Sequence, residues 1–188
     1  MKYIFTLIVL TCTAPLLHAQ TETRIGANFT ADLTFSNDLK PGVGLALERK
    51  LTKHSGLETG VYYRNNPVHF TTYVQVPPGG MFVFNSTVVE RFISVPLLYK
   101  FYSRIVNISA GPTFDFLLDA VQTKGAPNVV VTNYETSNSF DMGLMLKVGK
   151  QIKLANRWLL EPELRLNPLF SGERVYGGFS LGTRYVLR

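Results

Sequence analysis

The stretch Val175–Leu187 reads V-Y-G-G-F-S-L-G-T-R-Y-V-L and decides the fold. Its residues alternate between an apolar set and a small or polar set, which predicts a β-strand with one apolar face. The apolar set is Phe179, Leu181, Tyr185 and Leu187, and the other set is Gly178, Ser180, Gly182 and Arg184. A strand at a chain terminus leaves an unpaired edge. Pairing with the first strand would remove that edge, so the stretch predicts the closing strand of a barrel.

Seven segments upstream show the same period of two, and none shows a long apolar stripe at helical spacing. They are residues 25–35, 43–47, 57–63, 93–101, 106–116, 140–148 and 158–166. Turns are expected at Ser36–Pro41, Thr52–Ser55, Ser103-Arg104 and Ala155–Arg157, and long connections at Asn65–Glu90 and Asp119–Asn138. The pattern predicts an all-β fold, an eight-stranded antiparallel up-and-down transmembrane β-barrel. Because such barrels have short periplasmic turns and an even strand count, both termini are expected in the periplasm.

Composition fits a single membrane domain of 188 residues, with 46% hydrophobic and only 17% charged residues. The formal net charge is +6, but Lys and Arg form no run, so no nucleic-acid partner is expected. Residues 1–19 are interpreted as a signal peptide cleaved before Gln20, which leaves the barrel domain at residues 20–188. The alternative is a lipoprotein signal with Cys12 as the lipidated residue. Cys12 is the only cysteine, so a mature chain without it has no disulfide or cysteine-based metal site.

Two features predict that the apolar face points outward. Glycines fall on the polar parity, where they relieve crowding in a narrow eight-stranded interior; they are Gly26, Gly44, Gly60, Gly111, Gly143, Gly149, Gly178 and Gly182. The apolar face is too rich in aromatics to fit inside, and several lie near strand ends, as in membrane girdles. The expected girdle residues are Phe35, Tyr63, Phe116, Phe140 and Tyr176 on the external side and Phe101, Trp158 and Tyr185 on the periplasmic side.

The inward parity then carries charges of both signs. The expected lumen residues are Asp32, Glu48, Glu58, Arg64, Lys100, Asp115, Asp141, Lys147, Glu161, Glu163, Arg165 and Arg184. Buried charge is costly unless it is paired and hydrogen-bonded, so these side chains predict an ion-pair network that fills the lumen. The structural interpretation is favoured over a path for protons or ions.

The segment Arg91–Phe101, R-F-I-S-V-P-L-L-Y-K-F, is the most specific motif. With Arg91, Pro96 and Lys100 it resembles the R-x-I-x-[IV]-P-L-L-x-K-[FY] strand of the PorT-like outer membrane β-barrel domain family. The resemblance implies an eight-stranded barrel of the OmpA and OmpX type in the outer membrane of a Gram-negative cell. It also implies a porin-like description by fold, without an assigned activity.

The end of the chain resembles the C-terminal insertion signal of bacterial outer-membrane barrels. The matching residues are Gly182, Tyr185 and Leu187, although the chain adds Arg188 after the usual last position. The resemblance implies two partners, namely the barrel-assembly machinery during insertion and outer-membrane lipid afterwards.

The connection of residues 65–90 is rich in Val, Phe, Thr and Tyr, which does not suit a disordered loop. We expect a β-hairpin above the membrane with its tip at Pro77, Pro78, Gly79 and Gly80. Its unpaired edges could recruit an envelope protein by strand addition. The alternative is a hairpin that folds over the barrel mouth as a plug.

Catalytic, cofactor and metal sites are not expected. His54 and His69 are the mature histidines, and neither belongs to a recognisable Ser-His-carboxylate set. Asp115, Asp119 and Asp141 are candidates for a rim cluster that binds a cation or acts as an acid/base pair, although solvated rim charges are the simpler interpretation. The sequence favours a non-enzymatic interaction protein. A narrow passive channel for small solutes is the second interpretation, and an outer-membrane barrel enzyme the third.

Overall fold

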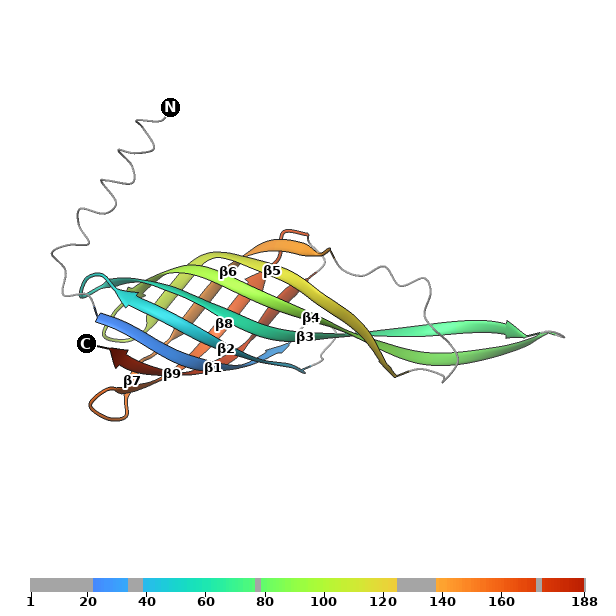
Figure 1. Cartoon of the computed structure of the whole chain (residues 1–188), viewed down its shortest axis with the longest axis horizontal. Coiled ribbons are helices and arrows are strands. Elements are labelled where there is room, and N and C mark those ends of the chain that lie inside the picture. The colour runs from blue at the N-terminus through green and yellow to red at the C-terminus, as the bar shows by residue number, and fades with distance from the viewer. Residues whose placement is uncertain (1–21, 34–38, 77–78, 125–137, 172–173, 188) are drawn as a thin grey trace, which may run out of the picture.

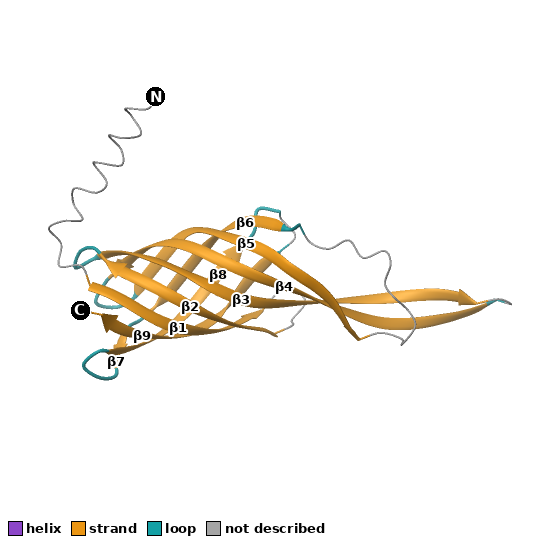
Figure 2. Ribbon diagram, in the orientation of Figure 1, coloured by secondary structure: helices purple, strands orange, loops and turns teal. Residues whose placement is uncertain are grey.

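A computed structural model describes residues 22–33, 39–76, 79–124, 138–171 and 174–187. Nine β-segments join in one antiparallel sheet that curls into a barrel (Figures 1 and 2). They are β1 (Glu22–Leu33), β2 (Leu39–Lys50), β3 (Ser55–Val76), β4 (Gly80–Tyr102), β5 (Asn107–Lys124), β6 (Phe140–Gly149), β7 (Ile152–Lys153), β8 (Trp158–Pro168) and β9 (Val175–Leu187). The described residues include no helix that is long and apolar enough to cross a membrane. The predicted signal peptide, residues 1–19, lies outside them.

The sheet closes on itself at two seams. The last strand, β9, pairs with β1 from Thr23↔Leu187 to Leu33↔Gly177, as the terminal stretch predicted. Strand β6 pairs with β8, and the short β7 continues β6 in the same register on β8. Since β6 and β7 act as one strand, the ring contains eight strands, and the predicted fold class is confirmed.

Two predicted connections are shorter than expected. Strand β2 begins at Leu39, and Pro41 pairs with Ala31, so the ladder includes part of the turn expected at Ser36–Pro41. Strand β5 continues to Lys124, because a register shift between Arg91 and Phe92 lets its later residues follow β4. The strand therefore takes up the first residues of the long connection expected at Asp119–Asn138.

The β3–β4 hairpin is much longer than the rest of the barrel. Its strands have 22 and 23 residues and keep one register from Ser55↔Phe101 to Val76↔Gly80. Beyond Arg64, β3 has no described partner except β4, and both strands extend past the barrel (Figure 1). The predicted projecting hairpin is confirmed. At its end Gly79 has a φ of 104°, a left-handed conformation that glycine adopts without a steric penalty; Pro77 and Pro78 lie outside the described residues.

Burial alternates along the strands in the predicted sense. Outward apolar side chains are open to the surroundings, as with Leu45 at 65% and Leu164 at 67% exposure, while the charged parity is buried. At the end with the short turns, the rings of Trp158 and Tyr185 lie 5.1 Å apart. An apolar outer wall with aromatics at its boundary is what a lipid environment requires.

Tyr176 corrects the predicted girdle. It is only 3% exposed and points inward, with the Lys40 ammonium 5.8 Å and the Arg64 guanidinium 5.3 Å from its ring centre. Its parity is that of Gly178, so the alternation of β9 places it with the inward set. Phe35 lies outside the described residues.

The inward glycines permit close strand contact. A Cβ atom on Gly26 would lie 1.8 Å from the Thr183 carbonyl oxygen across the β1–β9 seam. A Cβ atom on Gly111 would lie 2.1 Å from the Leu97 carbonyl oxygen. Both distances are far below van der Waals contact with backbone atoms, so neither position accepts a side chain without movement of a strand.

Candidate functional site

The lumen holds all twelve charged residues expected there. Each is buried in the structure, and four more buried charges, Arg24, Lys40, Glu90 and Arg174, join them. Among the described residues the buried set therefore contains eight cations and eight carboxylates. Such a balance means that the interior carries no net formal charge to attract ions of one sign.

Lys100 is the centre of this network. Its ammonium lies 2.8 Å from Glu48, 2.7 Å from Glu161 and 3.2 Å from Glu58. The three carboxylates come from β2, β8 and β3, while Lys100 comes from β4. One side chain thus connects four strands around the ring.

Three further cations complete what we call the central cluster: Glu48, Glu58, Glu161, Glu163, Lys100, Lys147, Arg184 and Arg24. The Lys147 ammonium lies 2.6 Å from Glu58 and 2.8 Å from Glu163. Arg184 reaches Glu58 at 3.6 Å and Glu161 at 3.7 Å, and Arg24 pairs with Glu48 at 2.7 Å. Four carboxylates face four cations, so each charge is compensated locally, as burial requires.

A second group of charges lies between the central cluster and the end that carries the long hairpin. Arg165 pairs with Asp32 at 2.6 Å, so its partner is Asp32 rather than the Glu161 or Glu163 of the same strand. Arg64 donates to Asn167 at 2.8 Å, and Asp115 accepts a hydrogen bond from Ser94 at 2.5 Å.

Rings and apolar side chains fill the remaining space. Tyr62, Phe92, Leu98 and Met145 are each at most 2% exposed, and all belong to the inward parity. The guanidinium of Arg174 lies 4.6 Å from the Phe92 ring centre, over the aromatic face. The described interior therefore resembles a packed plug of charges and rings more than a water-filled pore.

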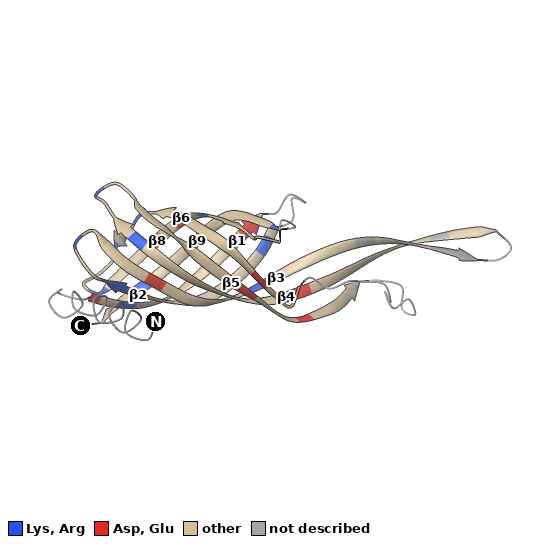
Figure 3. Cartoon of the chain, turned by 90° about the horizontal axis from the view of Figure 1, so that it is seen from above, with Lys and Arg blue, Asp and Glu red and all other residues tan. Residues whose placement is uncertain are grey.

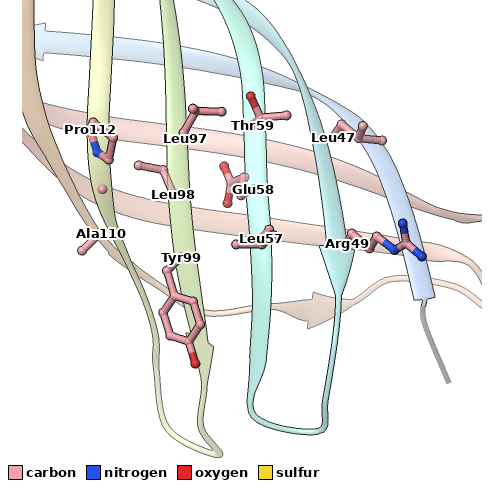
Figure 4. A pocket seen from close by; sticks show the side chains of 11 residues that line it. Leu47, Arg49, Leu57, Glu58, Thr59, Leu97, Leu98, Tyr99, Ala110 and Pro112 are labelled. Atoms are coloured by element: carbon pink, nitrogen blue, oxygen red, sulfur yellow. The ribbon is translucent and has the colours of Figure 1, made fainter. Parts of the chain in front are cut away.

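A hollow of about 530 Å³ lies on the outer wall, across strands β2 to β5 (Figure 4). Its lining includes Leu47, Leu57, Leu97 and Tyr99, which belong to the outward apolar face. The inward residues Glu58 and Leu98 also line it, but most of the lining is outward and apolar, so we interpret the hollow as a groove of the lipid-facing wall.

The histidines lie far apart in the fold. The Nδ1 atom of His54, in the turn between β2 and β3, is 3.2 Å from the Tyr102 carbonyl oxygen. The Nδ1 atom of His69, on the projecting hairpin, is 3.0 Å from the Thr87 hydroxyl. His54 precedes the start of β3 and His69 lies in the projecting half of that strand, so the two side chains cannot share one site. Within the described residues no group of three His, Cys, Asp or Glu side chains has metal-binding geometry.

The three candidate rim aspartates separate into two environments. Asp115 and Asp141 face each other across β5 and β6 and are buried, and Asp141 accepts from Ser171 at 2.6 Å and pairs with Arg174 at 3.1 Å. Asp119 lies outside and pairs with Arg91 at 3.1 Å. The candidate three-carboxylate cluster therefore does not form, because the β4–β5 register shift carries Asp119 to the outer surface, where it is a solvated rim charge as in the simpler interpretation.

The family-motif residues also have different roles. Arg91 is the exposed partner of Asp119, and the Pro96 carbonyl accepts a hydrogen bond from Thr59 at 2.9 Å. Lys100 is the centre of the central cluster. The residues of the insertion signal lie on the closing strand: Gly182 opposite Asn28, Tyr185 opposite Ile25 and Leu187 opposite Thr23.

Four buried charges escaped the sequence interpretation for different reasons. Arg24 lies on the inward parity of β1, so alternation alone could have identified it. Lys40 lies in a predicted turn and Glu90 in the predicted long connection, and the register places them opposite Asp32 and Asn66. Arg174 lies just before β9, outside any predicted strand, and its pairing with Asp141 depends on the folded loop.

Comparisons with known proteins concern both sequence and fold. A family model described as outer membrane protein beta-barrel domain matches residues 20–171. No curated protein matches the sequence. The outer membrane protein OprG from Pseudomonas aeruginosa is similar in structure, with a TM-score of 0.60, 12% identity and coverage of 91% of this chain and 98% of OprG. A major outer membrane protein from Thermus thermophilus gives 0.52 at 13% identity, with 89% and 100% coverage. At such identities the likeness shows the fold alone.

Proposed function

This chain belongs to the family of outer membrane protein beta-barrel domains, and on that premise we propose that it is a sealed, non-enzymatic barrel whose projecting hairpin binds another envelope protein. The observation that carries the proposal is the single register of β3 and β4 from the barrel to Val76↔Gly80. Residues 65–76 alone correspond to roughly 40 Å of strand at 3.3 Å per residue. A barrel needs no such extension to span a membrane.

The chemistry of the hairpin suits strand addition. Tyr73, Met81 and Val83 are 65%, 65% and 56% exposed, so its surface presents apolar and aromatic side chains. The edge of β3 beyond Arg64 has no described neighbour other than β4 and offers backbone donors and acceptors to an incoming strand. Main-chain pairing supplies affinity, and alternate side chains supply selectivity.

The orientation follows from the distribution of connections. The short turns, the start of β1 and the end of β9 lie at one end of the barrel, which we assign to the periplasm. The hairpin lies at the other end, which we assign to the cell exterior. The motif of Arg91, Pro96 and Lys100 supports placement in the PorT-like branch of the family. The end of β9, with Gly182, Tyr185 and Leu187, would be what the barrel-assembly machinery reads during insertion.

Cross-linking from the hairpin tests the proposal. A photoreactive phenylalanine analogue in place of Tyr73 should yield a protein adduct in intact cells. The same analogue in place of Phe179, which is exposed on the barrel wall, should meet lipid and serves as the matched control.

A truncation gives the second arm. Replacing residues 72–84 by Asn-Gly keeps the Thr71↔Asn85 pair as the last pair of the ladder. The shortened barrel should fold. When it is co-expressed with the photoreactive chain, it should not reduce the yield of the adduct at position 73, whereas co-expressed intact chain should reduce that yield by competing for the partner. Equal adducts from both positions, or loss of folding on truncation, would contradict the proposal.

A further inference from the structure

The unbalanced charge of this protein gathers at one end of the barrel. The buried set is balanced, so the net positive charge lies outside it. Of eight cations whose side chains are described outside the lumen, seven lie at the end with the short turns, and we call them the turn-end rim: Arg49, Lys50, Lys53, Arg104, Lys150, Lys153 and Arg157. The turns at this end carry blue segments in Figure 3.

The turn-end rim lacks negative partners among the described residues. Among the described residues, Glu22 is the one carboxylate that lies outside the lumen at this end, and it pairs with Arg24 at 2.7 Å. The eighth of these cations, Arg91, lies toward the hairpin and has Asp119 as its partner. The concentration of uncompensated charge is therefore a property of one end only.

Part of the rim surrounds a pocket of about 320 Å³. Lys50, Lys53, Arg104 and Lys150 line it together with neutral polar residues such as Asn107 and Gln151, and no carboxylate takes part in the lining. Four cations around one space suit a phosphate group, which presents several oxygen acceptors with negative charge.

The edge of the pocket is apolar. Ile105 lines the pocket and is 76% exposed. Phe101, on the outer wall, stacks on the pocket residue His54 with ring centres 6.3 Å apart. Trp158 and Tyr185 mark the membrane boundary at the same end, where amphipathic rings lie at the level of lipid head groups. A ligand that fits has both a phosphate and an apolar tail.

We propose that the turn-end pocket binds the phosphodiester head group of an anionic phospholipid, with the acyl chains along the outer wall beside Phe101 and Ile105. The lipid would come from the periplasmic leaflet, a point that rests on the orientation assigned above. Binding would hold the barrel at a fixed depth and give it an annulus enriched in anionic lipid, independently of the hairpin.

Native mass spectrometry of the full chain in detergent tests this site. Phosphatidylglycerol should remain bound at concentrations where phosphatidylcholine does not. Lys53→Gln combined with Arg104→Gln should weaken phosphatidylglycerol binding about tenfold or more, from the loss of two cations near the phosphate. The matched control, Arg91→Gln with Lys124→Gln, removes the same charge from the opposite end and should leave binding unchanged. Lys150→Gln provides a second variant at the pocket.

Competing ligands decide between phosphate sources. Glycerol 3-phosphate should not displace the lipid, since it lacks the chains; displacement at equal concentration would mean a site for soluble phosphate. Preference for lipid A over phosphatidylglycerol would place this end in the outer leaflet and overturn the proposal. So would equal losses in the pocket and control variants. Barrels truncated at residues 72–84 should bind the lipid normally, so failure of the hairpin proposal and failure of this one are separable.

Discussion

Lys100 illustrates how one buried residue can hold together the charges of a barrel interior. It is fully buried and lies within 4.0 Å of four carboxylates, those of Glu48, Glu58, Glu161 and Glu163. A buried pair adds little net stability over an apolar replacement, but removal of one partner leaves an uncompensated charge and is costly. The motif residue Lys100 thus keeps the acidic side chains tolerable inside the barrel and helps to close the lumen.

Replacement of Lys100 by methionine should therefore destabilise the barrel strongly. We expect Lys100→Met to lower the free energy of unfolding by about 3–5 kcal/mol, measured by urea titration in lipid vesicles. Lys153→Met, a similar change on an exposed cation in β7, should stay within about 0.5 kcal/mol. Adding Glu161→Leu to Lys100→Met should restore part of the loss. A silent Lys100→Met would argue that the central cluster is hydrated.

Leu164 and Arg165 are neighbours that face opposite environments. Leu164→Arg should cost about 2–4 kcal/mol if its side chain lies near the bilayer midplane, and no lumen substitution should rescue it. Arg165→Gln removes the partner of Asp32, so Asp32→Asn should recover part of its effect. The readout is the heat-modifiable gel shift together with urea titration. Rescue of Leu164→Arg by Asp32→Asn would mean that the faces are inverted.

At the level of single strands, the alternation of apolar and polar residues predicted which face of the barrel most side chains occupy. Parity predicted the inward position of Glu58 and Lys147 and the outward position of Leu164, because a strand in a closed barrel has only two faces. The partners could not be predicted, since Arg165↔Asp32 depends on the shear of the whole ring. The separation of Asp119 from Asp115 and Asp141 could not be predicted, because a register shift in β4–β5 leaves no clear sequence signal. The hairpin was predictable because β-rich composition continued past the expected membrane edge.

A substitution at the β1–β9 seam tests whether pairing of the first and last strands closes the ring. Gly26→Val should prevent tight pairing, because its Cβ would overlap the Thr183 carbonyl oxygen across the seam. We expect loss of the compact, heat-modifiable form on gels after refolding. Ala27→Val adds bulk to the outer face of the same strand and should fold normally. Normal folding of Gly26→Val would mean that β1 and β9 do not form a tight seam.

The whole molecule combines three regions with different charge and polarity. The outer wall is apolar, the buried lumen is balanced in charge, and the turn-end rim is basic. The hairpin adds a long exposed ribbon at the opposite end (Figure 1). Eight strands enclose a space that side chains can fill. A filled, balanced lumen opposes conduction, and for this reason both proposed interactions lie at the ends of the barrel.

Electrical recording in planar bilayers tests the sealed lumen most directly. Intact chain, and chain in which Asn-Gly replaces residues 72–84, should both give no sustained openings, because the central cluster blocks the lumen and the hairpin does not act as its lid. The variant Lys100→Met, if folded, provides a control in which the seal is weakened. Sustained, ion-selective openings of the intact chain would contradict the account and establish a channel. Openings that appear only after truncation would show that the hairpin is a plug.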